Sequence, residues 1–157
     1  MTSLASLTDG IITVGKGGRG FIVETTAESR VVITAAHCLP NLPPAHPAAY
    51  TDARTYRSVI GPLGGTPSIA AECLFADPMA DVAVLGEPDG QTMWTEYEAY
   101  HDFFNQRPSF TLGLMRRSCT GHLFALGGKW VPCSLHFDGA DALGRPWSPA
   151  WRVSVDA

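Results

Sequence analysis

Short apolar runs separated by glycine, proline and polar residues dominate the first half of the chain. Runs of this length, rich in β-branched residues and bounded by turn residues, are typical of β-strands. The runs that predict strands are residues 11–14, 21–25, 30–34, 56–60, 69–74 and 82–85. The glycine-rich stretch 15–20 predicts a hairpin turn. Six such strands in succession predict a small closed antiparallel barrel over residues 1–86.

The pattern changes in residues 87–108. Trp94, Tyr97, His101 and Phe104 recur at the spacing of one helical face, with acidic residues between them. This spacing predicts one amphipathic helix, packed across the junction that follows the barrel. An aromatic groove for a ligand would show the same spacing, but an aromatic face buried as core is the commoner arrangement.

The strand pattern returns in residues 109–157. Residues 109–115 predict one strand, and residues 119–126 and 129–137 predict a hairpin around Gly127 and Gly128. Three strands are too few to close a second barrel of the same size, so we expect an incomplete barrel with open strand edges. We therefore expect the chain to self-associate or to bind a partner protein.

A zinc site in this hairpin is an alternative, because Cys119 with His122 and Cys133 with His136 repeat a Cys-x-x-His spacing. In the predicted register Cys119 lies opposite His136, and His122 lies opposite Cys133. Residues three apart on a strand point to opposite faces, so the four ligands would divide between two faces. A tetrahedral site cannot close, and we expect neither a metal nor a cofactor.

Composition and charge narrow the class of protein. The 157 residues are 45% hydrophobic, which is enough for a packed core, and the net charge of -4 argues against a nucleic-acid-binding surface. No run approaches the length of a membrane span, and residues 1–7 lack the basic residues of a signal peptide. The four cysteines form no Cys-x-x-Cys pair. We expect a soluble, cytoplasmic protein without nucleic-acid or membrane partners.

Two titratable residues stand beside predicted strands. His37 follows the strand 30–34, and Asp81 opens the apolar run 81–85. A histidine that acts as a general base needs an acid to fix its tautomer and ring direction. We therefore expect Asp81 to be largely buried and to contact His37.

These stretches resemble the first half of a trypsin-like (chymotrypsin-superfamily) serine peptidase of the bacterial, zymogen-free type. The resemblance rests on residues 18–23 (GRGFIV), 34–38 (TAAHC) and 80–85 (ADVAVL), in the family's order and spacing. It implies an all-β, chymotrypsin-like double β-barrel, here with a complete first barrel, an incomplete second barrel and one amphipathic helix between them. It also implies peptide-bond hydrolysis, with His37 as general base and later acid and Asp81 orienting it. Secreted members pair the cysteine after the histidine with one on the preceding strand, but residues 21–23 contain none, so we expect a reduced Cys38.

The nucleophile that the resemblance implies is missing from its expected position. The family presents its serine in a Gly-x-Ser-Gly-Ser/Gly-Pro turn, and the local match is residues 144–149 (GRPWSP), which puts Pro146 at the serine position. Ser148 is the remaining candidate nucleophile, and the chain ends soon after it, so we expect the family's specificity pocket to be absent. We expect a serine endopeptidase domain for polypeptide substrates with impaired or no activity. The alternative is a catalytically dead peptidase-like module that binds a partner protein, and position 146 distinguishes the two.

Overall fold

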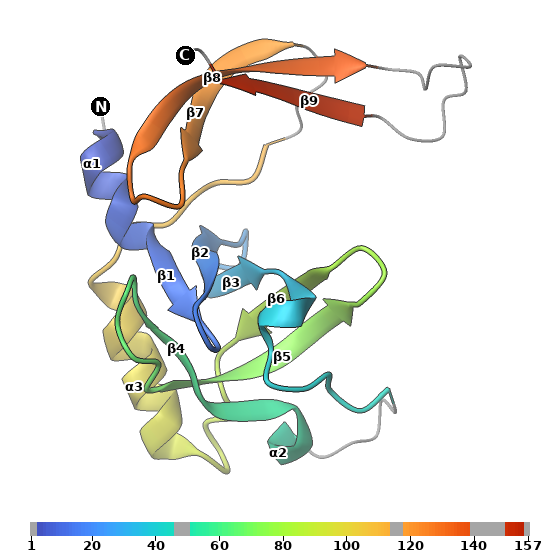
Figure 1. Cartoon of the computed structure of the whole chain (residues 1–157). Helices are drawn as coiled ribbons and strands as arrows, with labels where there is room; N and C mark the ends of the chain where they lie inside the picture. Colours follow the sequence, from blue (N-terminus) through green and yellow to red (C-terminus); the bar gives the residue numbers. More distant parts are fainter. Residues whose placement is uncertain (1–2, 46–50, 114–117, 139–149, 156–157) are drawn as a thin grey trace. The chain divides into compact units, whose positions relative to one another are not determined.

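The structure, a computed structural model, describes residues 3–45, 51–113, 118–138 and 150–155 (Figure 1). The chain forms two compact units, Met1–Leu112 and Gly113–Ala157, which are described separately below. The division predicted from the sequence, with a first barrel over residues 1–86, a linker with the amphipathic helix over 87–108 and a partial second barrel over 109–157, stays a prediction. In the part of the chain that the structure describes, no helix is both long enough and apolar enough to cross a membrane.

The first unit contains a closed barrel of six antiparallel strands in the order β1-β2-β3-β6-β5-β4, in which β1 also pairs with β4. The strands are β1 (Ile11–Val14), β2 (Gly18–Glu24), β3 (Arg30–Thr34), β4 (Thr55–Pro62), β5 (Ile69–Asp77) and β6 (Val82–Gly86). Short helical turns accompany them: α1 (Leu4–Leu7), η1 (Thr8–Gly10), η2 (Ala36–Cys38) and α2 (Thr51–Arg54). The six predicted strands and the closed antiparallel barrel are confirmed.

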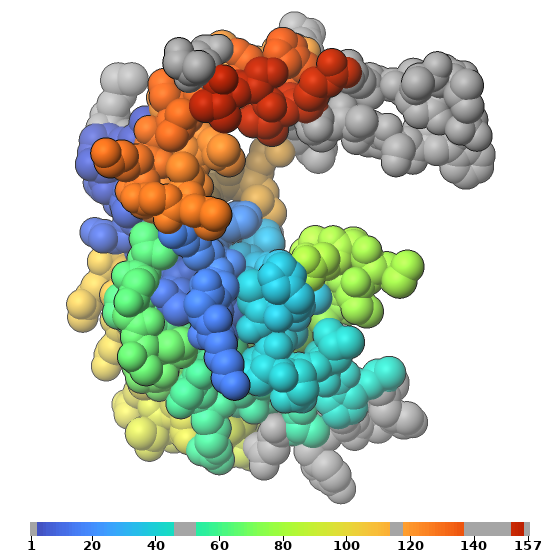
Figure 2. Space-filling model, viewed as in Figure 1, coloured from blue at the N-terminus to red at the C-terminus, as the bar shows by residue number. Residues whose placement is uncertain are grey.

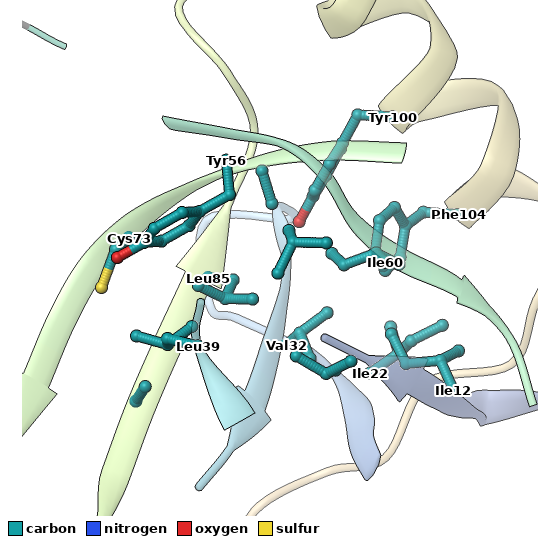
Figure 3. Close-up of a cluster of buried hydrophobic side chains, with 14 of the residues drawn as sticks. Ile12, Ile22, Val32, Leu39, Tyr56, Ile60, Cys73, Leu85, Tyr100 and Phe104 are labelled. Carbon is teal, nitrogen blue, oxygen red and sulfur yellow. The ribbon is translucent and has the colours of Figure 1, made fainter. Parts of the chain in front are cut away.

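The barrel core consists of apolar side chains from all six strands and from the following helix (Figure 3). The fully buried strand residues include Ile12, Val14, Ile22, Val32, Val59, Ile60 and Leu85. Apolar surface removed from water stabilises the fold by roughly 25 cal/mol per Å². The apolar runs of the sequence are therefore the residues that hold the barrel closed.

The predicted amphipathic helix is confirmed as α3 (Trp94–Asn105), which packs beside β5 (Figure 1). Its buried face is centred on Tyr100 and Phe104, and both point into the core from one side of the helix (Figure 3). The Tyr100 hydroxyl donates a hydrogen bond of 2.7 Å to the backbone carbonyl of Arg30. Trp94, predicted to share the buried face, has 60% of its surface exposed. The helix is thus part of the barrel's core.

The strand predicted over residues 109–115 is wrong for residues 109–113, and the remainder lies outside the described residues. Phe110 forms an isolated bridge to β2 instead, because β1 pairs with β2 only as far as Phe21. The Phe110 N–H donates to the carbonyl of Ile22 at 2.7 Å, and Glu24 N–H donates back to Phe110. Phe110 alone therefore forms hydrogen bonds with the backbone groups of β2 at this short edge, and a longer strand is not required to pair them.

The second unit contains a three-stranded antiparallel sheet in the order β7-β8-β9. Its strands are β7 (Cys119–Phe124), β8 (Trp130–Asp138) and β9 (Ala150–Val155). The β7–β8 hairpin was predicted from the sequence, whereas β9 was not. The described residues of this unit form a single sheet, so a second barrel is not shown.

The predicted register of the β7–β8 hairpin is wrong by one residue. Cys119 lies opposite Leu135, and His122 lies opposite Pro132. The loop holds three residues rather than two, because Ala125 N–H donates to the Lys129 carbonyl at 2.8 Å. The last loop residue is Gly128, whose φ of 78° is the left-handed conformation that such loops require.

The corrected register still divides the cysteines and histidines of the hairpin between two faces. Cys133 pairs with Gly121, two residues from Cys119, so both cysteines lie on one face. His122 and His136 lie on the other face, and both are exposed. Over the described ranges, no group of three or more His, Cys, Asp or Glu residues could hold a metal ion.

Candidate active site

The pairing of β3 with β6 brings His37 and Asp81 together. Thr34 at the end of β3 pairs with Ala83 near the start of β6. The turn that leaves β3 and the turn that enters β6 therefore lie at the same end of the barrel. His37 is the middle residue of η2, and Asp81 directly precedes β6.

Asp81 holds both the ring and the backbone of His37. Its Oδ2 lies 2.6 Å from His37 Nδ1, and its Oδ1 accepts the backbone N–H of His37 at 2.9 Å. The predicted contact is confirmed. A carboxylate can only accept, so the ring proton lies on Nδ1 and Nε2 is the acceptor of the neutral imidazole. This is the tautomer that a general base needs.

The expectation of a largely buried Asp81 is wrong. The side chain of Asp81 is 47% exposed and that of His37 is 74% exposed. The reason is that the turn before β6 is itself exposed: Met79, Ala80 and Val82 around Asp81 are all exposed. The hydrogen bond from the His37 backbone N–H, followed by that from its ring, lowers the pKa of Asp81 below its usual value. Hydrogen bonding by His37 therefore favours the charged form of this carboxylate and outweighs the opposing effect of desolvation.

The backbone of Asp81 adopts the left-handed conformation, with φ of 54°. Among the non-glycine residues that the structure describes, Glu28 is the only other with positive φ. This conformation costs roughly 1–2 kcal/mol for an L-residue and is best tolerated by Asn and Asp. The Oδ1 atom of Asp77 braces the same turn by accepting the N–H groups of Met79 and Ala80 at 2.8 and 3.0 Å. The strained residue is thus the one that positions His37.

A cavity of about 390 Å³ adjoins His37 and is formed by the β1–β2 turn and the segment after β3. Figure 2 shows this turn, in blue, against the cyan segment that carries His37. Its lining residues are Lys16, Gly17, Gly18, His37, Cys38, Leu39 and Pro40. The sequence predicted a hairpin turn at residues 15–20 but not this cavity. The repeated glycines of the turn are the sequence feature that could have indicated it.

Glycines in the β1–β2 turn make room for Cys38. A Cβ atom at Gly18 would lie 2.3 Å from Cys38 Sγ, and one at Gly15 would lie 1.9 Å from the Cys38 carbonyl oxygen. Cys38 is a free thiol and is half-buried. The close packing of Cys38 fixes the residue next to His37.

The predicted nucleophile region lies outside the described residues. Pro146 and Ser148 both fall in the range 139–149, so the structure does not place either of them. The structure therefore brings together two of the three predicted catalytic residues.

Comparison of the chain with protein-family models, curated proteins and solved structures finds no match.

Proposed function

We propose that this chain is a trypsin-like serine endopeptidase domain with impaired activity, which has the histidine–aspartate pair of the site but lacks a recognisable nucleophile turn in its sequence. The observation that supports this most directly is the double contact of Asp81 with His37, at 2.6 Å to Nδ1 and 2.9 Å to the backbone N–H. An acid that fixes both the ring and the backbone of one histidine is the arrangement expected of a general-base pair.

In this mechanism His37 Nε2 takes the proton from a serine hydroxyl as the serine oxygen attacks the carbonyl carbon of a peptide. The same proton then passes to the leaving amine as the peptide C–N bond breaks. A water molecule, deprotonated by the same nitrogen, then attacks the acyl-serine ester, and the proton returns to the serine oxygen as the acid product leaves. Asp81 stays ionised throughout and stabilises the imidazolium, in keeping with its lowered pKa. The cavity beside His37 offers space for the part of the polypeptide that leaves.

The sequence of residues 144–149 supports impaired activity. Pro146 stands at the serine position of the family's turn and has neither a hydroxyl nor an N–H group. Trp147 stands where the family has glycine, and its side chain would occupy space that the substrate needs. Ser148 remains as a candidate nucleophile between Trp147 and a second proline.

A peptidase-like module that binds a partner protein is the second candidate, and the sheet of the second unit favours it. Leu123 and Val153 are cross-strand neighbours of β8 residues on one face, and Val155 shares that face. All three are about half exposed. Apolar side chains gathered on one exposed face are typical of interaction surfaces. Light scattering across a concentration series, with Val153→Ser as the comparison, would show whether this face drives self-association.

The peptidase proposal is tested with a fluorophosphonate probe, which labels any activated serine without knowledge of the substrate. We expect the wild-type chain to show neither labelling nor casein hydrolysis above a His37→Ala control. Installing Pro146→Ser with Trp147→Gly would restore the family's turn, and we expect labelling that is lost again on adding His37→Ala. Absence of labelling in the restored variant, with the barrel intact by circular dichroism, would overturn the peptidase assignment. Wild-type labelling that disappears in Ser148→Ala would instead overturn the impairment.

A further inference from the structure

A second cavity of about 620 Å³ lies at the other end of the β3–β6 pair from His37. It is lined by the start of β3, by β5 near Glu72, by the loop 86–91 and by the first turn of α3. Glu72 pairs with Gly86 at the end of β6, whereas Asp81 precedes the beginning of that strand. The cavity belongs wholly to the first unit and does not adjoin the histidine–aspartate pair.

Three carboxylates line this cavity: Glu72, Glu87 and Asp89. Glu72 is only 8% exposed, and its Oε1 lies 2.9 Å from a guanidinium nitrogen of Arg54. Burial raises the pKa of Glu72, Arg54 opposes this rise, and Asp89 adds to it. Asp89 is thus close enough to repel Glu72, so a further positive charge in the cavity would stabilise both carboxylates.

Arg54, which pairs with Glu72, does not line the cavity, and the charge of the cationic residue that does line it is directed elsewhere. Arg30 is its one cationic lining residue, and its guanidinium donates hydrogen bonds to the carbonyls of Phe104 and Arg107 at the end of α3. His101 Nε2 lies 2.8 Å from Glu87 Oε2, but not in the direction of a hydrogen bond. Glu72 is therefore already paired with Arg54, so Glu87 and Asp89 are the lining carboxylates that a further positive charge would approach.

Two stacked aromatic rings form a wall of the same cavity. The rings of Trp94 and Tyr97 lie 5.5 Å apart between centroids at 22°, and Trp94 is 60% exposed. Gly90 allows the loop to approach this pair, because a Cβ atom there would lie 3.1 Å from the Tyr97 ring. Aromatic faces attract cations, and tryptophan attracts them most strongly.

We propose that this cavity binds an organic ammonium ion, with its charge beside Glu87 and Asp89 and its carbon atoms against Trp94 and Tyr97. The combination of carboxylates with an aromatic wall suits a cation that carries apolar groups. A bare metal ion fits less well, because the described residues include no cluster of His, Cys, Asp or Glu arranged to hold one. The ammonium group can come from a lysine side chain of a peptide or from a small free amine.

The test is an NMR titration of the full chain with three probes: Nα-acetyl-lysine methylamide, its neutral norleucine counterpart and choline. We expect saturable shifts in the amides of the 86–91 loop and in the Trp94 indole N–H with a charged probe, and none with norleucine. Saturation by the lysine probe alone assigns the site to peptides, and saturation by choline alone assigns it to small amines. Equal responses to the lysine and norleucine probes, or no saturation by either charged probe, would overturn the proposal.

Matched variants locate the binding. We expect Trp94→Leu and Glu87→Gln each to weaken binding by about threefold or more, the effect of one cation–aromatic or charge contact at an exposed site. Glu96→Gln is the control, since Glu96 lies on the same helix but pairs with Arg57 at 2.6 Å and does not line the cavity. A loss in Glu96→Gln as large as in Glu87→Gln would show that net charge alone attracts the probe, and would overturn the site.

Discussion

Substituting Phe104 by alanine tests whether α3 is part of the barrel rather than a linker after it. Phe104 is 2% exposed and its ring lies 4.1 Å from that of Tyr100 between centroids. Removing a buried phenylalanine costs about 3–5 kcal/mol of the free energy of unfolding, through lost burial and the cavity left behind. A domain of this size is stable by about 5–15 kcal/mol, so the variant should lose a large share of its stability.

The assay is urea denaturation followed by far-ultraviolet circular dichroism. We expect Phe104→Ala to lower the midpoint strongly while barrel and helix still unfold together. Tyr100→Phe should cost about 1–3 kcal/mol, because it leaves the partly buried Arg30 carbonyl without the tyrosine donor. Trp94→Ala is the control, and its exposed ring should change stability by less than about 1 kcal/mol. A loss below 1 kcal/mol in Phe104→Ala, or a separate transition for the helix, would refute the reasoning.

Three further predictions concern the turn beside His37, the buried tyrosines and the second unit. Gly18→Ala should cost about 1–3 kcal/mol by overpacking against Cys38, whereas Gly127→Ala, with open space around it, should be nearly neutral in urea denaturation. Burial raises the pKa of Tyr56 to about 12 and raises that of Tyr100 as well. The unfolded chain therefore loses protons above pH 10 that the folded chain keeps, so stability should fall between about pH 10 and 12, and Tyr56→Phe should flatten this fall. Hydrogen exchange should protect the barrel strands more than the three-stranded sheet, and equal protection would contradict the expected weakness of a sheet with two edges.

The barrel could be predicted because its strands are encoded locally. Runs such as 11–14 and 30–34 are apolar and bounded by turn residues. One closed sheet buries the apolar side chains of all these runs together. The hairpin register could not be predicted, since it depended on Gly128 taking a positive φ and adding one residue to the loop. The bridge at Phe110 also could not be predicted, because it fills an edge that exists only once β1 and β2 have paired.

The sequence predicted which two residues contact each other in the candidate site, but it did not predict how exposed they are. His37 and Asp81 follow and precede strands that pair, so their proximity follows from topology. The exposure of Asp81 follows from the exposed turn in which it lies, and the apolar run after Asp81 gives no information about that turn. Glu72 and Trp94 both line the second cavity, but they are distant in the sequence. No local motif could therefore predict that they come together.

The most direct test of the histidine–aspartate pair is the tautomer of His37 in solution, read from ¹⁵N NMR of histidine-labelled protein at neutral pH. We predict a proton fixed on Nδ1, with a slowly exchanging ring N–H that disappears in Asp81→Asn, because that proton is donated to Asp81 Oδ2 at 2.6 Å. The exposed His122 in the same spectrum serves as the reference for a histidine on an open strand face. A His37 ring protonated on Nε2, or indistinguishable from His122 and unchanged by Asp81→Asn, would contradict the general-base pair on which the proposed function rests.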